Sequence, residues 1–244
     1  MISAVPRRLT FARGFTLAEM AVVLVIVALL IAGMVLPISA QQEIRARQET
    51  EKTLNDIREA LIGYAASHAA SDGKPHLPCP DKTTDTGDGK HNDGSEDRSG
   101  GACDFQEGNV PWVTLGVGRN DAWNNRFRYR VAAGFSNSST GFTLNSAGGD
   151  MEVCADSACA ASIANSVPTL VLSHGPNGFG AINTNGIANA LPANADELEN
   201  TDAATDGTTI RYISKTPDGN FDDLVTWVPT TVLMNRMLTS GKLP

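Results

Sequence analysis

The longest apolar run in the sequence lies near its start. Residues 20–36 are all apolar or glycine, and Phe15 to Glu19 precede them. At 1.5 Å of rise per residue, a helix over residues 20–36 would measure about 25 Å, close to the thickness of a bilayer core. The pattern predicts a transmembrane helix over residues 15–37, and Gly33 and Pro37 near its end are expected to weaken or kink the helix there.

Charges on either side of the run set its predicted orientation. Arg7, Arg8 and Arg13 precede it. Because basic residues mark the cytoplasmic side, residues 1–14 are predicted to be cytoplasmic and the rest of the chain to lie outside. The single acid at the head of the run, Glu19, is costly in a membrane and indicates a specific partner.

Two simpler interpretations of this segment remain open. A secretory signal peptide would need a small-residue cleavage site after the apolar core, and the sequence there fits the A-x-A pattern poorly. A plain membrane anchor would have no use for Glu19.

Beyond the apolar run the spacing changes to that of an amphipathic helix. Leu54, Ile57, Leu61 and Tyr64 follow one another at intervals of three and four residues. The segment ends at Asp72-Gly73-Lys74-Pro75, a run that breaks helices. Residues 38–72 are therefore predicted to be the second half of one long stem helix, with one face packed on a globular domain.

Residues 73–244 show short alternating segments in place of a helical period. The segment at 126–131, RFRYRV, predicts a strand with Phe127, Tyr129 and Val131 turned inward. Further predicted strands are 141–145, 151–155, 169–174, 209–214 and 224–228. The expected fold is α+β: a long helix on a mainly antiparallel sheet with long loops.

Composition narrows the functional classes. The chain has 244 residues, a net charge of −8 and no basic stripe after residue 60, so nucleic-acid binding is not predicted. The string around Ser173 lacks the G-x-S-x-G pattern of a nucleophile elbow, and neither a Walker A motif nor H-E-x-x-H occurs. The sequence therefore predicts no enzyme.

The four cysteines form two pairs that are local in sequence. Outside the cytoplasm an even number of cysteines indicates disulfides, and four allow three connectivities. Of these, Cys79–Cys103 with Cys154–Cys159 is favoured. A zinc site of Cys79 and Cys103 with His76 and His91 is the alternative, but its spacing fits no familiar finger.

The segment between Cys79 and Cys103 is rich in acids. Asp81, Asp85, Asp88 and Asp93 supply the oxygen ligands that calcium prefers. No frame matches the EF-hand pattern, and a solvated acidic loop is the alternative interpretation.

The string RGFTLAEM, residues 13–20, resembles the processing motif of type IV prepilins and of the pseudopilins of type II secretion. The resemblance implies cleavage by prepilin peptidase between Gly14 and Phe15, and N-methylation of Phe15. It implies that Glu19, the fifth mature residue, pairs with the terminal amine of a neighbouring subunit during assembly.

Other strings extend the resemblance into the globular domain. DAWNNRFRYR, residues 121–130, is similar to the D-x-W-G-N-x-x-x-Y stretch of major pseudopilins, with Asn124 where glycine is usual. SHGPNGFGA (173–181) and FDDLVTWV (221–228) resemble their later loop and last strand. Because that family binds calcium before the last strand, the resemblance implies a second calcium site at Asp218, Asp222 and Asp223.

The implied protein is a structural subunit, a minor pilin or pseudopilin, since residues 76–118 and 181–217 look like insertions. Its implied partners are other subunits, prepilin peptidase and an inner-membrane assembly platform. It would be a single-pass inner-membrane protein with a periplasmic domain until it joins a filament. The alternative function is a membrane-tethered, calcium-dependent binding module that does not polymerise.

Overall fold

The computed structural model describes residues 14–201 and 210–244, with the side chains of residues 32–40 left out. The predicted leader, residues 1–14, lies outside this range except for Gly14. The chain divides into two compact units, Met1–Arg45 and Ala46–Pro244. The helix α1, Leu17–Ser67, belongs in part to each.

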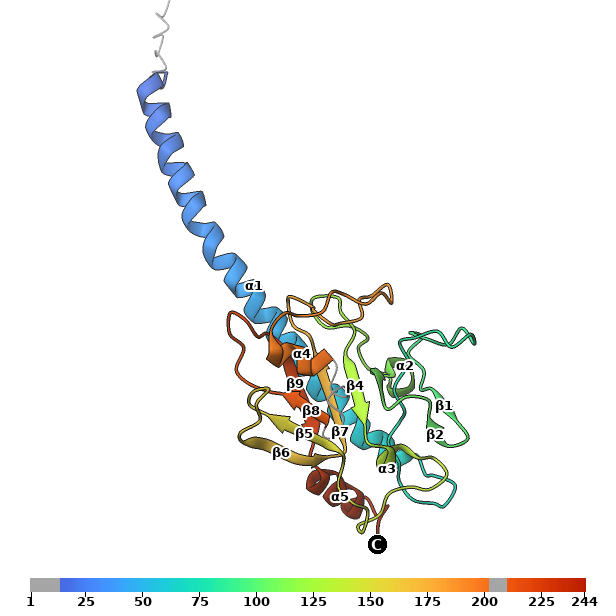
Figure 1. The fold of residues 1–244 in the computed structure, drawn as a ribbon. Coiled ribbons are helices and arrows are strands. Elements are labelled where there is room, and N and C mark those ends of the chain that lie inside the picture. The colour runs from blue at the N-terminus through green and yellow to red at the C-terminus, as the bar shows by residue number, and fades with distance from the viewer. Residues whose placement is uncertain (1–13, 202–209) are drawn as a thin grey trace, which may run out of the picture. The chain divides into compact units, whose positions relative to one another are not determined.

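The remaining elements all belong to the second unit, where strands far apart in sequence pair with one another (Figure 1). They are β1 (Arg98–Ser99), β2 (Ala102–Cys103), β3 (Glu107–Asn109), α2 (Trp112–Leu115), β4 (Arg128–Val131), α3 (Ala133–Ser136), β5 (Met151–Cys154), β6 (Ser162–Val167), β7 (Thr169–Ser173), α4 (Ala195–Thr201), β8 (Ile210–Ile213), β9 (Leu224–Val228) and α5 (Thr230–Thr239).

These strands form three sheets among the residues described. The largest has the order β3-β4-β7-β9 and is antiparallel throughout. The second has the order β6-β5-β8, and its β5–β8 pair is parallel. A two-stranded ribbon, β1-β2, is the third. The predicted single, mainly antiparallel sheet is therefore divided.

The core of the second unit forms where α1 meets the largest sheet. Leu54, Ile57 and Leu61 of α1 are buried in one cluster with Phe127 and Tyr129. These are the stripe and the inward strand positions that the sequence pattern predicts. Alternation on β4 places apolar side chains in the core, and the stripe of α1 covers them.

The first unit corrects the prediction of a transmembrane stem. Among the residues described, no helix combines the length and the apolar content needed to cross a membrane.

The membrane-spanning assignment of residues 15–37 is therefore wrong, and the single-pass inner-membrane location that rested on it is corrected with it. The type IV pilin-like stem predicted for the fold is not shown either. What the structure shows is an α+β fold with several sheets.

Most predicted strands are present, with differences at their ends. Five segments correspond to β4, β5, β7, β8 and β9. The segment 141–145 instead has no strand: residues 141–143 are irregular and a turn follows at 144–145. Helix α5 was not predicted, although its Leu233 and Met237 are buried in the core. Helix α1 ends at Ser67, five residues before the predicted end at residue 72.

Candidate functional site

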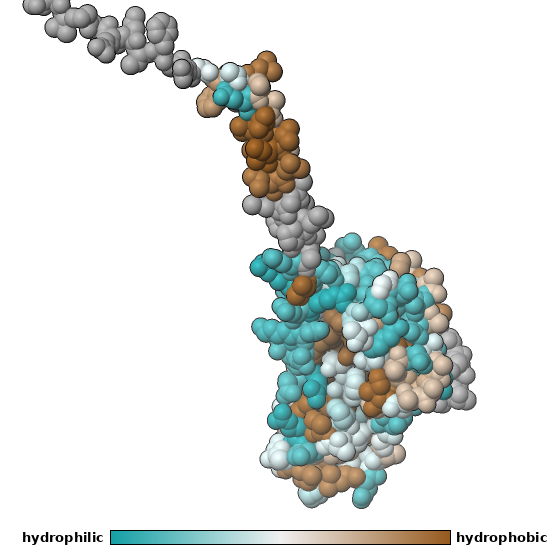
Figure 2. Space-filling view, turned by 90° about the vertical axis from the view of Figure 1, so that its left-hand side faces the viewer, coloured by the Kyte–Doolittle hydropathy of each residue, from teal (hydrophilic) through white to brown (hydrophobic). Residues whose placement is uncertain are grey.

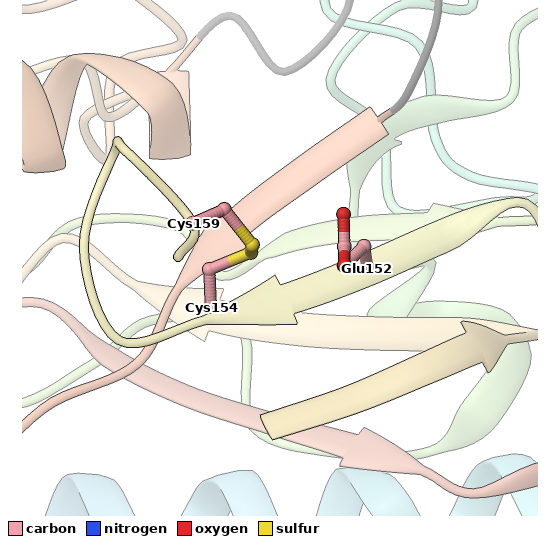
Figure 3. A group of neighbouring side chains, drawn as sticks. All are labelled: Glu152, Cys154 and Cys159. Atoms are coloured by element: carbon pink, nitrogen blue, oxygen red, sulfur yellow. A yellow bond between two sulfur atoms is a disulfide. The ribbon is translucent and has the colours of Figure 1, made fainter. Parts of the chain in front are cut away.

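Both predicted disulfides are present. Cys79 bonds to Cys103 across 24 positions, and Cys154 bonds to Cys159 across five. Figure 3 shows the second bond between the end of β5 and the turn that follows, with Glu152 earlier on the same strand. Because all four sulfurs are in disulfides, the zinc alternative loses its thiolate ligands.

The start of α1 holds Glu19 by a reciprocal capping contact. The Glu19 carboxylate accepts hydrogen bonds from the backbone N–H and the hydroxyl of Thr16, both at 2.8 Å. The backbone N–H of Glu19 donates back to the Thr16 hydroxyl at 3.2 Å. This is the capping box of a T-x-x-E sequence.

The capping box gives Glu19 a use within its own helix, which the sequence analysis missed even though the T-x-x-E spacing signals it. The hydrogen bonds from Thr16 lower the pKa of Glu19, so the carboxylate is charged at neutral pH. Gly14 and Phe15 are exposed, and no atom of the described chain approaches the position of a Cβ on Gly14 within 4 Å. The predicted cleavage point is therefore accessible.

The three strings of the globular unit that carry the resemblance meet in space. Asp121 accepts hydrogen bonds from the backbone N–H groups of Trp123 and Asn125 and from the Ser173 hydroxyl, the last at 2.6 Å. Residues 173–177 in turn contact Asp222, whose carboxylate accepts the N–H of Asn177 at 3.0 Å. Residues 121–125, 173–177 and 221–223 thus form one connected loop cluster.

Asn124 explains the departure from the expected glycine in this cluster. Its φ angle is +67°, in the left-handed region that glycine adopts freely. Among other residues, asparagine adopts this conformation most readily. The position therefore needs a positive φ, and asparagine meets that need.

Three carboxylates converge at the edge of the loop cluster. Ligand oxygens of Glu197, Asp222 and Asp223 lie within 4.8 Å of one another. Glu197 and Asp222 line a pocket of about 490 Å³. Asn177 and the backbone of Asp222 both donate to Glu197, while Asn200 donates to Asp223 at 2.7 Å. The Asp222 Oδ1 atom is buried and has no hydrogen-bond partner.

The charge of Asp222 is disfavoured in this structure. Burial raises its pKa to about 6, and the charges of Glu197 and Asp223 add to the effect. A divalent cation would relieve both effects, and oxygen ligands of this kind suit calcium. The three carboxylates are therefore the residues best placed to hold a metal.

This group matches the sequence prediction only in part. The structure brings the predicted Asp222 and Asp223 together, but not Asp218, which accepts the N–H groups of Asn220 and Phe221 and lies 3.6 Å from Lys215. Glu197 was missed because it lies on α4 and only tertiary structure brings it close. Its local signal, Asn194 as an N-cap, indicates a helix but not a ligand.

The other predicted calcium ligands are arranged differently. Asp81, Asp85, Asp88 and Asp93 are not among the groups of described residues close enough to share an ion. A buried ammonium stands among the acids of this loop instead: Lys82 Nζ lies 2.6 Å from Asp88 and 3.8 Å from Asp97. An internal cation therefore supplies the positive charge in this loop.

Comparison of the sequence with protein-family models, and of the chain with curated proteins and solved structures, finds no match.

Proposed function

We propose that this chain is a structural subunit, of the minor pilin or pseudopilin kind, of a type II secretion or type IV pilus filament. In this proposal prepilin peptidase cuts between Gly14 and Phe15 and methylates Phe15. The apolar part of α1 then packs against the same segment of other copies.

The observation that carries the proposal is the apolar surface directly after the cleavage point. Six consecutive residues, Val22 to Val27, are each 43–65% exposed. Because consecutive helical positions point in directions about 100° apart, these six side chains project on all sides of the helix. Figure 2 shows the apolar surface on one face of this segment. A helix that is apolar on every side needs to be buried by a partner.

Other copies of the chain are the partner that Glu19 favours. It is the single charged residue between Gly14 and Ile31. Within packed apolar helices a lone carboxylate is costly unless an opposite charge meets it. Cleavage at Gly14 creates such a charge, the amine of Phe15, in every copy.

The positive φ of Asn124 and the meeting of the three loop strings support the same proposal. The three segments that resemble those of pseudopilins are joined by hydrogen bonds from Ser173 to Asp121 and from Asn177 to Asp222. Asn124, in the first of them, has the positive φ that glycine would adopt. Three chance resemblances at separate places in the sequence would not be expected to lie together in one loop cluster.

A pair of variants tests the role of Glu19. Glu19→Gln keeps the capping box, since glutamine serves at this position, but removes the charge. Thr16→Val removes the hydroxyl of the capping box but keeps the carboxylate. The proposal predicts that Glu19→Gln is lost from filaments while Thr16→Val is incorporated, as measured by electron microscopy and immunoblotting of sheared filaments.

The reverse result would contradict the pairing account. If Glu19→Gln assembled and Thr16→Val did not, Glu19 would act as a helix cap alone. Circular dichroism of both variants serves as the control that the second unit remains folded.

A calcium-dependent binding module is the second candidate function, and the group of Glu197, Asp222 and Asp223 favours it. Such a module would bind calcium and a ligand yet show no self-association after cleavage. Analytical ultracentrifugation of the processed chain with and without calcium separates the two functions.

A further inference from the structure

A second pocket of the globular unit lies on the other side of His174, whose ring is close to Asp223, one of the three carboxylates. It has a volume of about 180 Å³ and shares no lining residue with the pocket beside Asp222. Its polar lining comes from β3, from β4 and from the loops next to them and to β7. These side chains are Thr83, Glu107, Asn109, Arg126, Arg128 and His174.

His174 is a buried polar residue whose side chain forms no hydrogen bond within the described chain. It is 1% exposed, and neither of its ring nitrogens has a hydrogen-bond partner. A charged group lies nearby: Asp223 Oδ1 is 3.7 Å from His174 Nδ1, which is beyond hydrogen-bond range. A buried polar group without a partner costs stability, so native structures seldom keep one without a use.

Arg126 presents a second unused donor to the same pocket. Its side chain is buried, Nη1 donates to the carbonyl of Asn92 at 2.8 Å, and the guanidinium stacks 4.5 Å above Trp112. Its Nε has no partner, and no carboxylate of the described residues forms an ion pair with it. The lining thus holds a fixed positive charge with a free N–H.

Two of the acids near the pocket, Glu107 and Asp81, are engaged by other donors. Glu107 forms ion pairs with Arg128 and Arg130. Asp81, the carboxylate that interacts electrostatically with Arg126, accepts the N–H of Asp93 and the amide of Asn109. Neither meets the free Nε of Arg126 or the nitrogens of His174.

We propose that this pocket binds a small oxyanion, a carboxylate or a phosphate, with His174 and Arg126 as its donors. Guanidinium and imidazole N–H groups form short charge-assisted hydrogen bonds to such oxygens. The volume matches a ligand of a few heavy atoms, since a cavity of about 150 Å³ holds benzene. The site is independent of filament assembly, because all its residues belong to the second unit.

Thermal unfolding of the full chain tests the site. Sodium phosphate and sodium acetate are the probes, and sodium chloride at equal ionic strength is the reference. At ten times the dissociation constant, one of the two probes is expected to raise Tm by about 3–6 °C. Equal Tm values in all three salts would overturn the proposal, since water alone would then fill the pocket.

Two variants test whether the rise in Tm comes from an anion bound in this pocket. His174→Phe keeps a ring of similar size but removes both nitrogens, and it should abolish the response to the anion. In chloride its Tm should not fall by much, because the lost nitrogens make no hydrogen bond in this structure. His68→Phe, at the exposed histidine directly after α1, is the matched control and should respond as the unmodified chain does.

Thr83→Phe provides a second variant if His174→Phe does not fold. It adds a ring at the pocket lining, at a half-buried position, and should also abolish the response. A response that persists in either folded variant would place the anion elsewhere and overturn the proposal.

Discussion

The two parts of α1 differ in where their apolar side chains find partners. In the second unit Leu54, Ile57 and Leu61 pack against the sheet and are at most 3% exposed. In the first unit Leu29 and Leu30 are 68% and 58% exposed and have no place in that core. The second unit is therefore stabilised by its own contacts, whereas the described apolar side chains of the first unit are left exposed.

A matched pair of leucines in α1 gives the largest expected difference. Leu61→Ala should destabilise the second unit by about 2–5 kcal/mol, because it leaves a cavity in the core. Leu29→Ala should change stability by less than about 0.5 kcal/mol and weaken assembly instead. Urea unfolding followed by circular dichroism measures the first effect and filament recovery the second. Equal destabilisation by both substitutions would contradict the comparison.

The two disulfides are a further source of stability within the second unit. In the chain-entropy model, loss of Cys79–Cys103 should cost about 3.5 kcal/mol and loss of Cys154–Cys159 about 2 kcal/mol, since the first closes the longer loop. Paired Cys→Ala variants and their urea midpoints test this order.

If removal of Cys79–Cys103 cost less than about 1 kcal/mol, other contacts would hold the intervening segment. Lys82 with its acids, and the Glu96 carboxylate that accepts the N–H of Cys79, are the contacts available for this.

Calcium gives the smallest expected effect and contrasts two acidic regions within the second unit. Calcium should raise Tm by a few degrees at pH 7.5, and EDTA should reverse the rise. Asp222→Asn should abolish the response. Asp88→Asn should preserve it, because Asp88 already pairs with Lys82. An unchanged Tm in the unmodified chain would exclude calcium at Asp222.

The pH dependence of this response follows from Asp222. Its pKa is raised to about 6 from an ordinary 3.8, so the folded state holds the proton more tightly than the unfolded state. Without calcium, the contribution of Asp222 to stability is therefore present below pH 4 and is lost as pH rises through about 6. The calcium response should change in the opposite direction and weaken from pH 7.5 to pH 5, because a protonated carboxyl binds the ion poorly. A response that strengthens at pH 5 would contradict this assignment.

Sequence patterns predicted the features that depend on local spacing. The buried stripe of α1, the inward positions Phe127, Tyr129 and Val131, and both disulfides are all as expected. Each depends on a short-range repeat or on sequence proximity.

Features that depend on tertiary contacts could not be predicted from local sequence patterns. The approach of Glu197 to Asp222 requires α4 to fold back on the loop before β9, and no spacing encodes that. The burial of Lys82 among acids reverses the expectation for a charged loop residue. The length of the apolar run at residues 20–36 suggested a transmembrane helix, but the described part of α1 is not long and apolar enough to cross a membrane.

The most direct test of the proposed function is the mass of the N-terminal peptide of the chain, made together with a prepilin peptidase. The account predicts a peptide that begins at Phe15 and carries one added methyl group, and Gly14→Ala should abolish both changes. A peptide that still begins at Met1, or one cut after the apolar run and not before it, would contradict the account.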